Sequence, residues 1–176
     1  MSTAAITRPE ASEYQPYFAK YVTLVPDGDI INTLERQLNE TLATLHGLTE
    51  AEANTRHAPY TWSIKEVVGH LTDAERIFGY RALRFARGDA TALPGFDEND
   101  YVRHANFDAR PFSELLSEYE MLRRSHISMF RGLDDAAWLR TGIANGHPIS
   151  VRALAYNIAG HELHHGAILR KRLGRS

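Results

Sequence analysis

Two histidines near the end of the chain, His161 and His165, are the residues whose type and spacing most directly indicate chemistry. Residues four apart on a helix project from the same face one turn apart, so both imidazole rings could reach one cation. That helix face is otherwise apolar, and a buried imidazole costs free energy unless its nitrogens find partners. A shared metal ion would satisfy both rings at once. The alternative is a pair of core histidines that hydrogen-bond to polar neighbours.

A stable zinc or nickel site needs a third ligand, which must come from another helix. His70 is the best candidate, because it lies three residues after Val67 and one before Leu71, at the margin of an apolar helical stripe. In a helical bundle this position could point inward, although His70 taken alone fits a surface position equally well. We therefore predict one divalent metal ion on His70, His161 and His165, with part of its coordination sphere open.

The segment from His161 to His165 also matches the H-E-x-x-H pattern of zinc proteases, in which the glutamate serves as general base. That pattern carries weight only in a matching fold, so a protease is the minor alternative. Glu162 is a candidate catalytic residue, either as a base or as a support for a ligand ring or nucleophile. His164 lies on a different helix face, where we expect a boundary residue or a supporting partner of the site.

The remaining histidines and the acidic residues give weaker signals. His126 falls on the apolar stripe of the helix expected over residues 111–132 and could approach the metal, but a hydrogen-bonded core histidine is favoured. The acidic residues around Asp97 could line the mouth of a pocket or form a solvated loop. Surface positions in loops or at helix ends are expected for the other histidines: His46, His57, His104 and His147.

Four long helices are predicted to position these side chains. Helical spacing of apolar residues, together with capping and stop signals, places them at about residues 29–47, 63–88, 111–132 and 150–174. Ser63 with Glu66 makes a capping box at the start of the second helix. No segment shows the alternation typical of a strand, and Asn145-Gly146 with Pro148 marks a turn. The predicted fold class is therefore all-α, a four-helix bundle.

Two other segments connect or cover the predicted bundle. Residues 88–110 form a long connection that could contain a short helix, and connections of this length often carry function. Residues 14–25 are aromatic and apolar without a clear period, and we expect an irregular arm that packs on the bundle. The polar composition of the first residues predicts a flexible lead at residues 1–13, and the length of 176 residues predicts a single domain at residues 14–176.

Composition excludes several classes of function. The chain has no cysteine, so disulfides, thiolate zinc sites, iron–sulfur clusters and a cysteine nucleophile are all excluded. A formal charge of −2 without a basic block argues against a nucleic-acid partner. The sequence contains no run of eighteen apolar residues, so no membrane span is predicted, and we expect a cytoplasmic protein.

The sequence resembles the DinB-like superfamily, in particular the branch of YfiT-type metal-dependent hydrolases and bacillithiol transferases. The resemblance runs along nearly the whole chain. Its most specific parts are the W-S-x-x-E-x-x-x-H-L stretch from Trp62 to Leu71 and the H-x-x-x-H motif from His161 to His165.

This resemblance implies an up-down-down-up four-helix bundle, often a homodimer, with nickel, zinc or a similar ion on three histidines that map to His70, His161 and His165. It also implies that a low-molecular-weight thiol could serve as cofactor. We therefore expect a metal-dependent thiol transferase or hydrolase that acts on a small molecule. The alternative is a non-catalytic, stress-related protein that binds a metal or ligand, and a cleft that reaches the metal would favour the enzyme.

Overall fold

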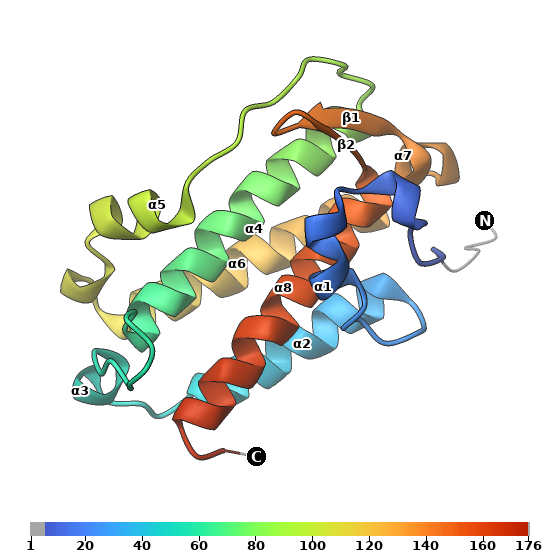
Figure 1. Cartoon of the computed structure of the whole chain (residues 1–176). Coiled ribbons are helices and arrows are strands. Elements are labelled where there is room, and N and C mark those ends of the chain that lie inside the picture. Colours follow the sequence, from blue (N-terminus) through green and yellow to red (C-terminus); the bar gives the residue numbers. More distant parts are fainter. Residues whose placement is uncertain (1–5, 176) are drawn as a thin grey trace.

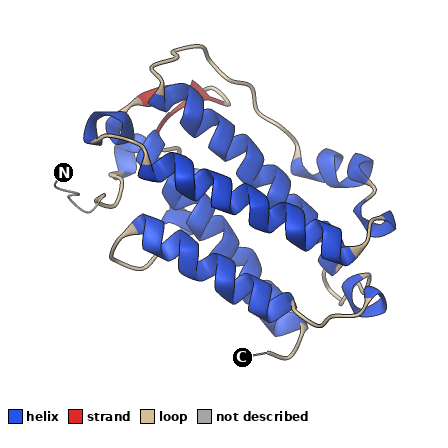
Figure 2. Cartoon of the chain, turned by 180° about the vertical axis from the view of Figure 1, so that it is seen from behind, coloured by secondary structure: helices blue, strands red, loops and turns tan. Residues whose placement is uncertain are grey.

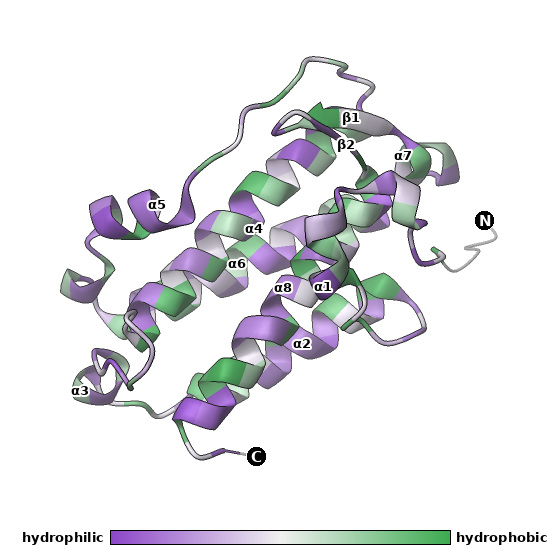
Figure 3. Ribbon diagram, viewed as in Figure 1, coloured by the Kyte–Doolittle hydropathy of each residue, from purple (hydrophilic) through white to green (hydrophobic). Residues whose placement is uncertain are grey.

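Four long helices form the core of the computed structural model, which describes residues 6–175 (Figure 1). They are α2 (Ile30–Leu45), α4 (Ile64–Ala86), α6 (Phe112–Arg131) and α8 (Val151–Arg172). The shorter elements are η1 (Ala11–Glu13), η2 (Pro16–Phe18), α1 (Ala19–Val22), α3 (Glu50–Ala53), α5 (Glu98–Ala105), η3 (Phe107–Ala109), α7 (Asp135–Leu139), β1 (Thr141–Ala144) and β2 (His147–Ser150). No helix among the described residues is long and apolar enough to cross a membrane, and Figure 3 shows hydrophilic residues mixed with hydrophobic ones along the long helices.

The bundle has the up-down-down-up order that the resemblance implied. Helices α2 and α8 run in one direction and α4 and α6 in the other, as the sequence colours of Figure 1 show. Figure 2 shows the same helices from behind. Both α2 and α4 pack against α6 and α8. Because α4 and α6 are parallel, the chain between them must return along the length of the bundle, and a helix of α4's 23 residues is about 34 Å long. This return explains the long connection over residues 88–110, which contains α5 as expected.

Local capping explains where three of the long helices begin. The Asp29 carboxylate accepts hydrogen bonds from two backbone N–H groups of the first turn of α2. Ser63 and Glu66 form the predicted capping box at α4, and Ser150 Oγ accepts from Ala153 N at α8. These side chains satisfy N–H groups that have no partner inside the helix. Helix α6 instead begins directly after Pro111, without a side-chain cap.

A short antiparallel hairpin, β1 and β2, is the element that the sequence analysis did not predict. Asn145 and Gly146 both have positive φ angles, of 51° and 77°, as a two-residue hairpin turn requires. The turn signal was therefore correct. The strands were missed because each has only four residues and β2 contains Pro148, so no alternating pattern develops. Leu93 of the long connection forms a bridge with Ala144 and joins that connection to the hairpin.

The arm before the bundle packs closely on α8. It contains η2 and α1 rather than only irregular chain, and Tyr21 and Val22 are buried. A side chain at Gly160 of α8 would clash with the Tyr21 carbonyl oxygen, so the two backbones touch. Part of the expected lead also contacts this region, since Arg8 donates to the Val22 carbonyl at 2.7 Å. The division into a lead and one domain stays a prediction, and residues 1–5 lie outside the described part.

Candidate metal centre

Three histidines from two neighbouring helices converge at one end of a cavity beside α4 and α8. His70 lies on α4 and His161 and His165 lie on α8, and the ring nitrogens that they offer all lie within 4.8 Å of one another. His70 Nε2 and His161 Nε2 are 3.0 Å apart. The three pairs of ring centroids are separated by 4.9, 4.9 and 4.6 Å. The residues that the sequence analysis selected thus come together in one cluster.

The cluster fits a divalent metal ion. Bonds between zinc and histidine nitrogen measure about 2.0–2.1 Å, which places two ligand nitrogens about 2.9 Å apart at a right angle and about 3.3 Å apart at the tetrahedral angle. The 3.0 Å between the Nε2 atoms of His70 and His161 falls in that range. Among residues 6–175, no other histidine, aspartate or glutamate joins the group. Three histidines could therefore hold an ion and leave coordination positions for a small molecule.

Burial keeps these histidines in the neutral form that binds metals. Burial lowers the pKa of His70 to about 4. Burial, and then the neighbouring His70, lower the pKa of His165 to about 3. The pKa of His161 lies well below its ordinary value, first because of burial and then because of His165. All three imidazoles therefore have a free ring nitrogen at neutral pH.

A cavity of about 450 Å³ reaches the three histidines. The arm, α4, the 88–110 connection and the β1–β2 hairpin form its walls. The Tyr21 and Phe78 rings lie 5.2 and 6.2 Å from the His161 ring, and the Trp62 ring lies 4.8 Å from the His70 ring. Aromatic side chains thus surround the cluster on the cavity side, where they limit the access of water.

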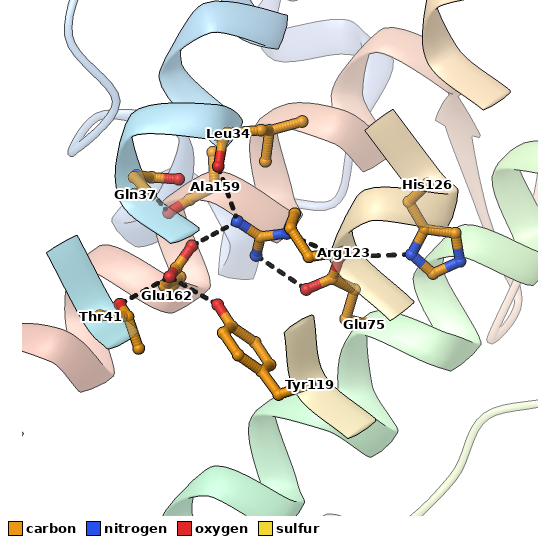
Figure 4. Close-up of polar contacts among 9 residues, drawn as sticks. All are labelled: Leu34, Gln37, Thr41, Glu75, Tyr119, Arg123, His126, Ala159 and Glu162. Carbon is orange, nitrogen blue, oxygen red and sulfur yellow. Dashed lines mark hydrogen bonds and ion pairs between the residues drawn. The ribbon is translucent and has the colours of Figure 1, made fainter. Parts of the chain in front are cut away.

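Glu162 lies away from this cavity and is not among its lining residues. Figure 4 shows its carboxylate among side chains of α2 and α6. Thr41 Oγ1 and Tyr119 OH donate to Glu162 Oε1 at 2.7 and 2.5 Å, and Arg123 Nη1 donates to Oε2 at 2.6 Å. This geometry favours a role in holding α8 in place, while a role as base stays a prediction.

Arg123 links Glu162 to a second buried carboxylate, Glu75 of α4 (Figure 4). Its Nε and Nη2 donate to the two Glu75 oxygens at 2.7 Å each. Burial raises the pKa of Glu75, but Arg123 and then His126 lower it, and the net shift is downward. The sequence analysis missed this network. The available signal was a charged residue four positions after Tyr119, in register with the apolar stripe of α6.

The buried face of α6 therefore differs from the predicted one. Leu115 and Tyr119 are buried as predicted, but after them the buried positions are Arg123, Ile127 and Phe130. His126, which was predicted on the core stripe, lies at its margin, and its Nδ1 is 3.2 Å from Glu75 Oε1. It is not part of the histidine cluster, and its position agrees with the favoured alternative of a hydrogen-bonded histidine.

Several cavity residues carried no strong sequence signal. His147, expected as an ordinary surface residue, lines the cavity from the hairpin, and His164 lines it from α8. Glu98, from the acidic group around Asp97, lines it as well. Arg81 lines it from α4, although nothing in its sequence surroundings distinguishes it from the other arginines of that helix.

Comparisons with known proteins agree with this fold. The family model described as the DinB superfamily matches residues 33–169. The chain belongs to the DinB superfamily. A protein of Geobacillus thermodenitrificans (strain NG80-2) named "Putative metal-dependent hydrolase" is 27% identical over 147 residues, which cover 79% of this chain and 82% of that protein.

Two solved structures resemble this DinB-superfamily chain. One is YfiT from Bacillus subtilis, described as "a probable metal-dependent hydrolase with an unusual four-helix bundle topology". It superposes with a TM-score of 0.75 at 19% identity, over 99% of this chain and 97% of that one. The other is a mycothiol-dependent maleylpyruvate isomerase, with a TM-score of 0.69 at 12% identity, over 84% of this chain and 62% of that one. At these identities the likeness shows a shared fold.

Proposed function

We propose that the chain is a metal-dependent enzyme that binds one divalent ion through His70, His161 and His165 and acts on a small molecule. The observation that carries this proposal is the cavity that reaches a cluster of three histidines without a fourth protein ligand among the described residues. A site with a purely structural role would normally be closed by a fourth side chain. The names of the similar hydrolases support metal dependence.

The proposed reaction is thiol transfer or hydrolysis. An ion on three neutral histidines would keep its full charge and lower the pKa of a thiol or water that binds beside it. The aromatic walls of the cavity would exclude bulk water and hold the apolar part of a substrate. The resemblance and the thiol-dependent isomerase favour a low-molecular-weight thiol over water as the nucleophile. Nickel and zinc are the proposed ions.

A homodimer in the cytoplasm, with a small molecule rather than nucleic acid or membrane as partner, completes the proposal. The homodimer rests on the resemblance alone. Sedimentation equilibrium should then give twice the chain mass of 19.9 kDa.

Metal analysis of single variants tests the ligand assignment. His70→Ala and His165→Ala should each lose most of the bound metal after dialysis, because two imidazoles do not hold an ion stably. His126→Ala is the matched control, since it removes a half-buried histidine outside the cluster, and it should retain about one ion per chain. Full occupancy in both cluster variants would show that the assignment is wrong.

Spectroscopic titration tests the open coordination position. Cobalt- or nickel-substituted protein should develop a thiolate-to-metal charge-transfer band with at least one of bacillithiol, mycothiol, glutathione and cysteine. His165→Ala should show no such band. If none of these thiols gives a band, thiol activation by the metal is excluded as the proposed chemistry. A band without turnover of any thiol acceptor would instead support a non-catalytic binding protein.

A further inference from the structure

Arg81 is a buried cation at the wall of the cavity. It lies on α4 with 5% of its surface exposed, and its guanidinium is 5.9 Å from the centre of the Phe78 ring. Its Nη2 donates to the Pro94 carbonyl at 2.7 Å. The other two guanidinium nitrogens have no hydrogen-bond partner among the described residues, and neither is sealed in the core. Arg81 therefore has donors that a bound molecule could use.

The other two buried arginines have more hydrogen-bond partners than Arg81, although Nη1 of Arg172 has none among the described residues. Arg123 is paired with two carboxylates, Glu75 and Glu162. Arg172 donates to two backbone carbonyls and to a histidine ring. Among residues 6–175, no carboxylate forms an ion pair with Arg81, although Glu98 lines the same cavity. Burying an unpaired charge is costly, and burial lowers the pKa of Arg81 accordingly. An anion from outside the chain would remove that cost.

The position of Arg81 relative to the histidines defines the shape of such a ligand. Arg81 follows His70 by eleven residues on α4, which is about three turns and places both on one helix face, with about 16 Å between their Cα atoms. Long side chains on a helix lean toward its N-terminus, so the guanidinium is displaced toward the histidine end. Ala74 and Phe78 line the cavity between them.

We propose that Arg81 binds a carboxylate at one end of an elongated substrate whose apolar middle lies along α4. A single guanidinium with free donors matches the two oxygens of a carboxylate. Placing the other, reacting end at the histidine cluster rests on the proposed function. The carboxylate preference itself rests only on Arg81 and the cavity.

Calorimetric titration with octanoate and 1-octanol, which differ only in the end group, tests this preference. The purified protein should bind octanoate about tenfold to a hundredfold more tightly than 1-octanol, the range expected for hydrogen bonds between charged groups. Arg81→Gln should bring the ratio close to one, because glutamine can still donate to the Pro94 carbonyl but carries no charge. Arg87→Gln removes an exposed charge from the C-terminal end of the same helix and should leave the ratio unchanged.

Two results would overturn the proposal. One is that Arg81→Gln leaves the ratio of octanoate to 1-octanol affinity unchanged. The other is that the wild-type protein binds octanoate no better than 1-octanol. If Arg81→Gln does not fold, Arg81→Lys decides, because it keeps the charge but loses the planar pair of donors. It should lower the ratio several-fold. An unchanged ratio in that variant would contradict the proposal equally.

His165→Ala separates this inference from the proposed function. Octanoate could bind the metal instead of Arg81, and the preference would then disappear in His165→Ala and persist in Arg81→Gln, which would overturn the inference. If the preference persists in His165→Ala and disappears in Arg81→Gln, the inference holds. That conclusion does not depend on whether the histidines bind an ion. The carboxylate proposal and the proposed function can therefore be disproved independently of each other.

Discussion

The neutral state of the three clustered histidines is a property of their burial. Imidazole binds metal only when it is unprotonated, and an isolated histidine titrates near pH 6.5. The pKa values of about 4 for His70 and about 3 for His165 keep a ligand nitrogen available well below that pH. Burial beside aromatic rings thus leaves ring nitrogens free for the proposed ion.

The same pKa shifts predict acid sensitivity of the metal-free protein. Between about pH 6.5 and pH 4 these histidines are protonated in the unfolded chain but remain neutral in the folded chain. Acid therefore favours unfolding. The free energy of unfolding should therefore fall as the pH drops through this window, by up to about 1.4 kcal/mol per pH unit for each histidine. Denaturant titrations at pH 7, 6 and 5 measure this slope. His165→Ala should show a shallower slope, and an identical slope would contradict the assigned cause.

The buried ion pair between Glu162 and Arg123 predicts that Glu162 contributes to the stability of the fold. Glu162→Gln removes one of the two charges that face a buried guanidinium, and breaking such a pair costs about 3–5 kcal/mol. The variant should unfold at lower urea concentration but keep its metal. Glu120→Gln, which breaks an exposed pair with Arg124, should change stability by less than about 1 kcal/mol. Loss of activity in Glu162→Gln with unchanged stability would instead show that Glu162 acts as a base.

At the scale of the elements, the long helices could be predicted because their signals are local. Apolar spacing and caps such as Ser63 and Ser150 lie within a few residues of the helix that they specify. The buried face of α6 could not be predicted in this way. Arg123 can be buried there only because α4 and α8 supply carboxylates that pair with it. The walls of the cavity depend likewise on contacts between distant segments. His161 and His165 could be found from their spacing, whereas Arg81 could not.

The contact between α1 and α8 predicts a difference between two glycines of one helix. Gly160→Ala should destabilise the protein and move Tyr21 away from His161, because the new Cβ would meet the Tyr21 backbone. Gly166→Ala is the matched control, since its Cβ would be 3.4 Å from the flexible end of Arg170 and alanine favours helix. It should be neutral or stabilising. Thermal unfolding of both variants measures the difference, and equal effects would contradict the close approach.

At the scale of the whole molecule, the proposed ion would join α4 to α8. A ligand that binds only the folded chain stabilises it, by about 4 kcal/mol at a thousandfold excess over its dissociation constant. For a chain of this size, that corresponds to a rise in Tm of roughly 10 °C. Zinc or nickel should raise the Tm of the wild-type protein by this order, and a chelator should reverse the change. An equal rise in His165→Ala would place the stabilising ion elsewhere.

Two kinds of structural element line the cavity, long helices of the bundle and shorter connecting segments. The histidines lie on the long helices α4 and α8, whereas much of the surrounding wall comes from the arm, the 88–110 connection and the hairpin. Loops and short elements tolerate sequence change better than a packed core does. Mutations there could alter which molecules enter while the ligand nitrogens keep their places. If the proposed function holds, substrate choice and metal chemistry can diverge independently in this architecture, and exchanging the hairpin between relatives would be a route to new specificity.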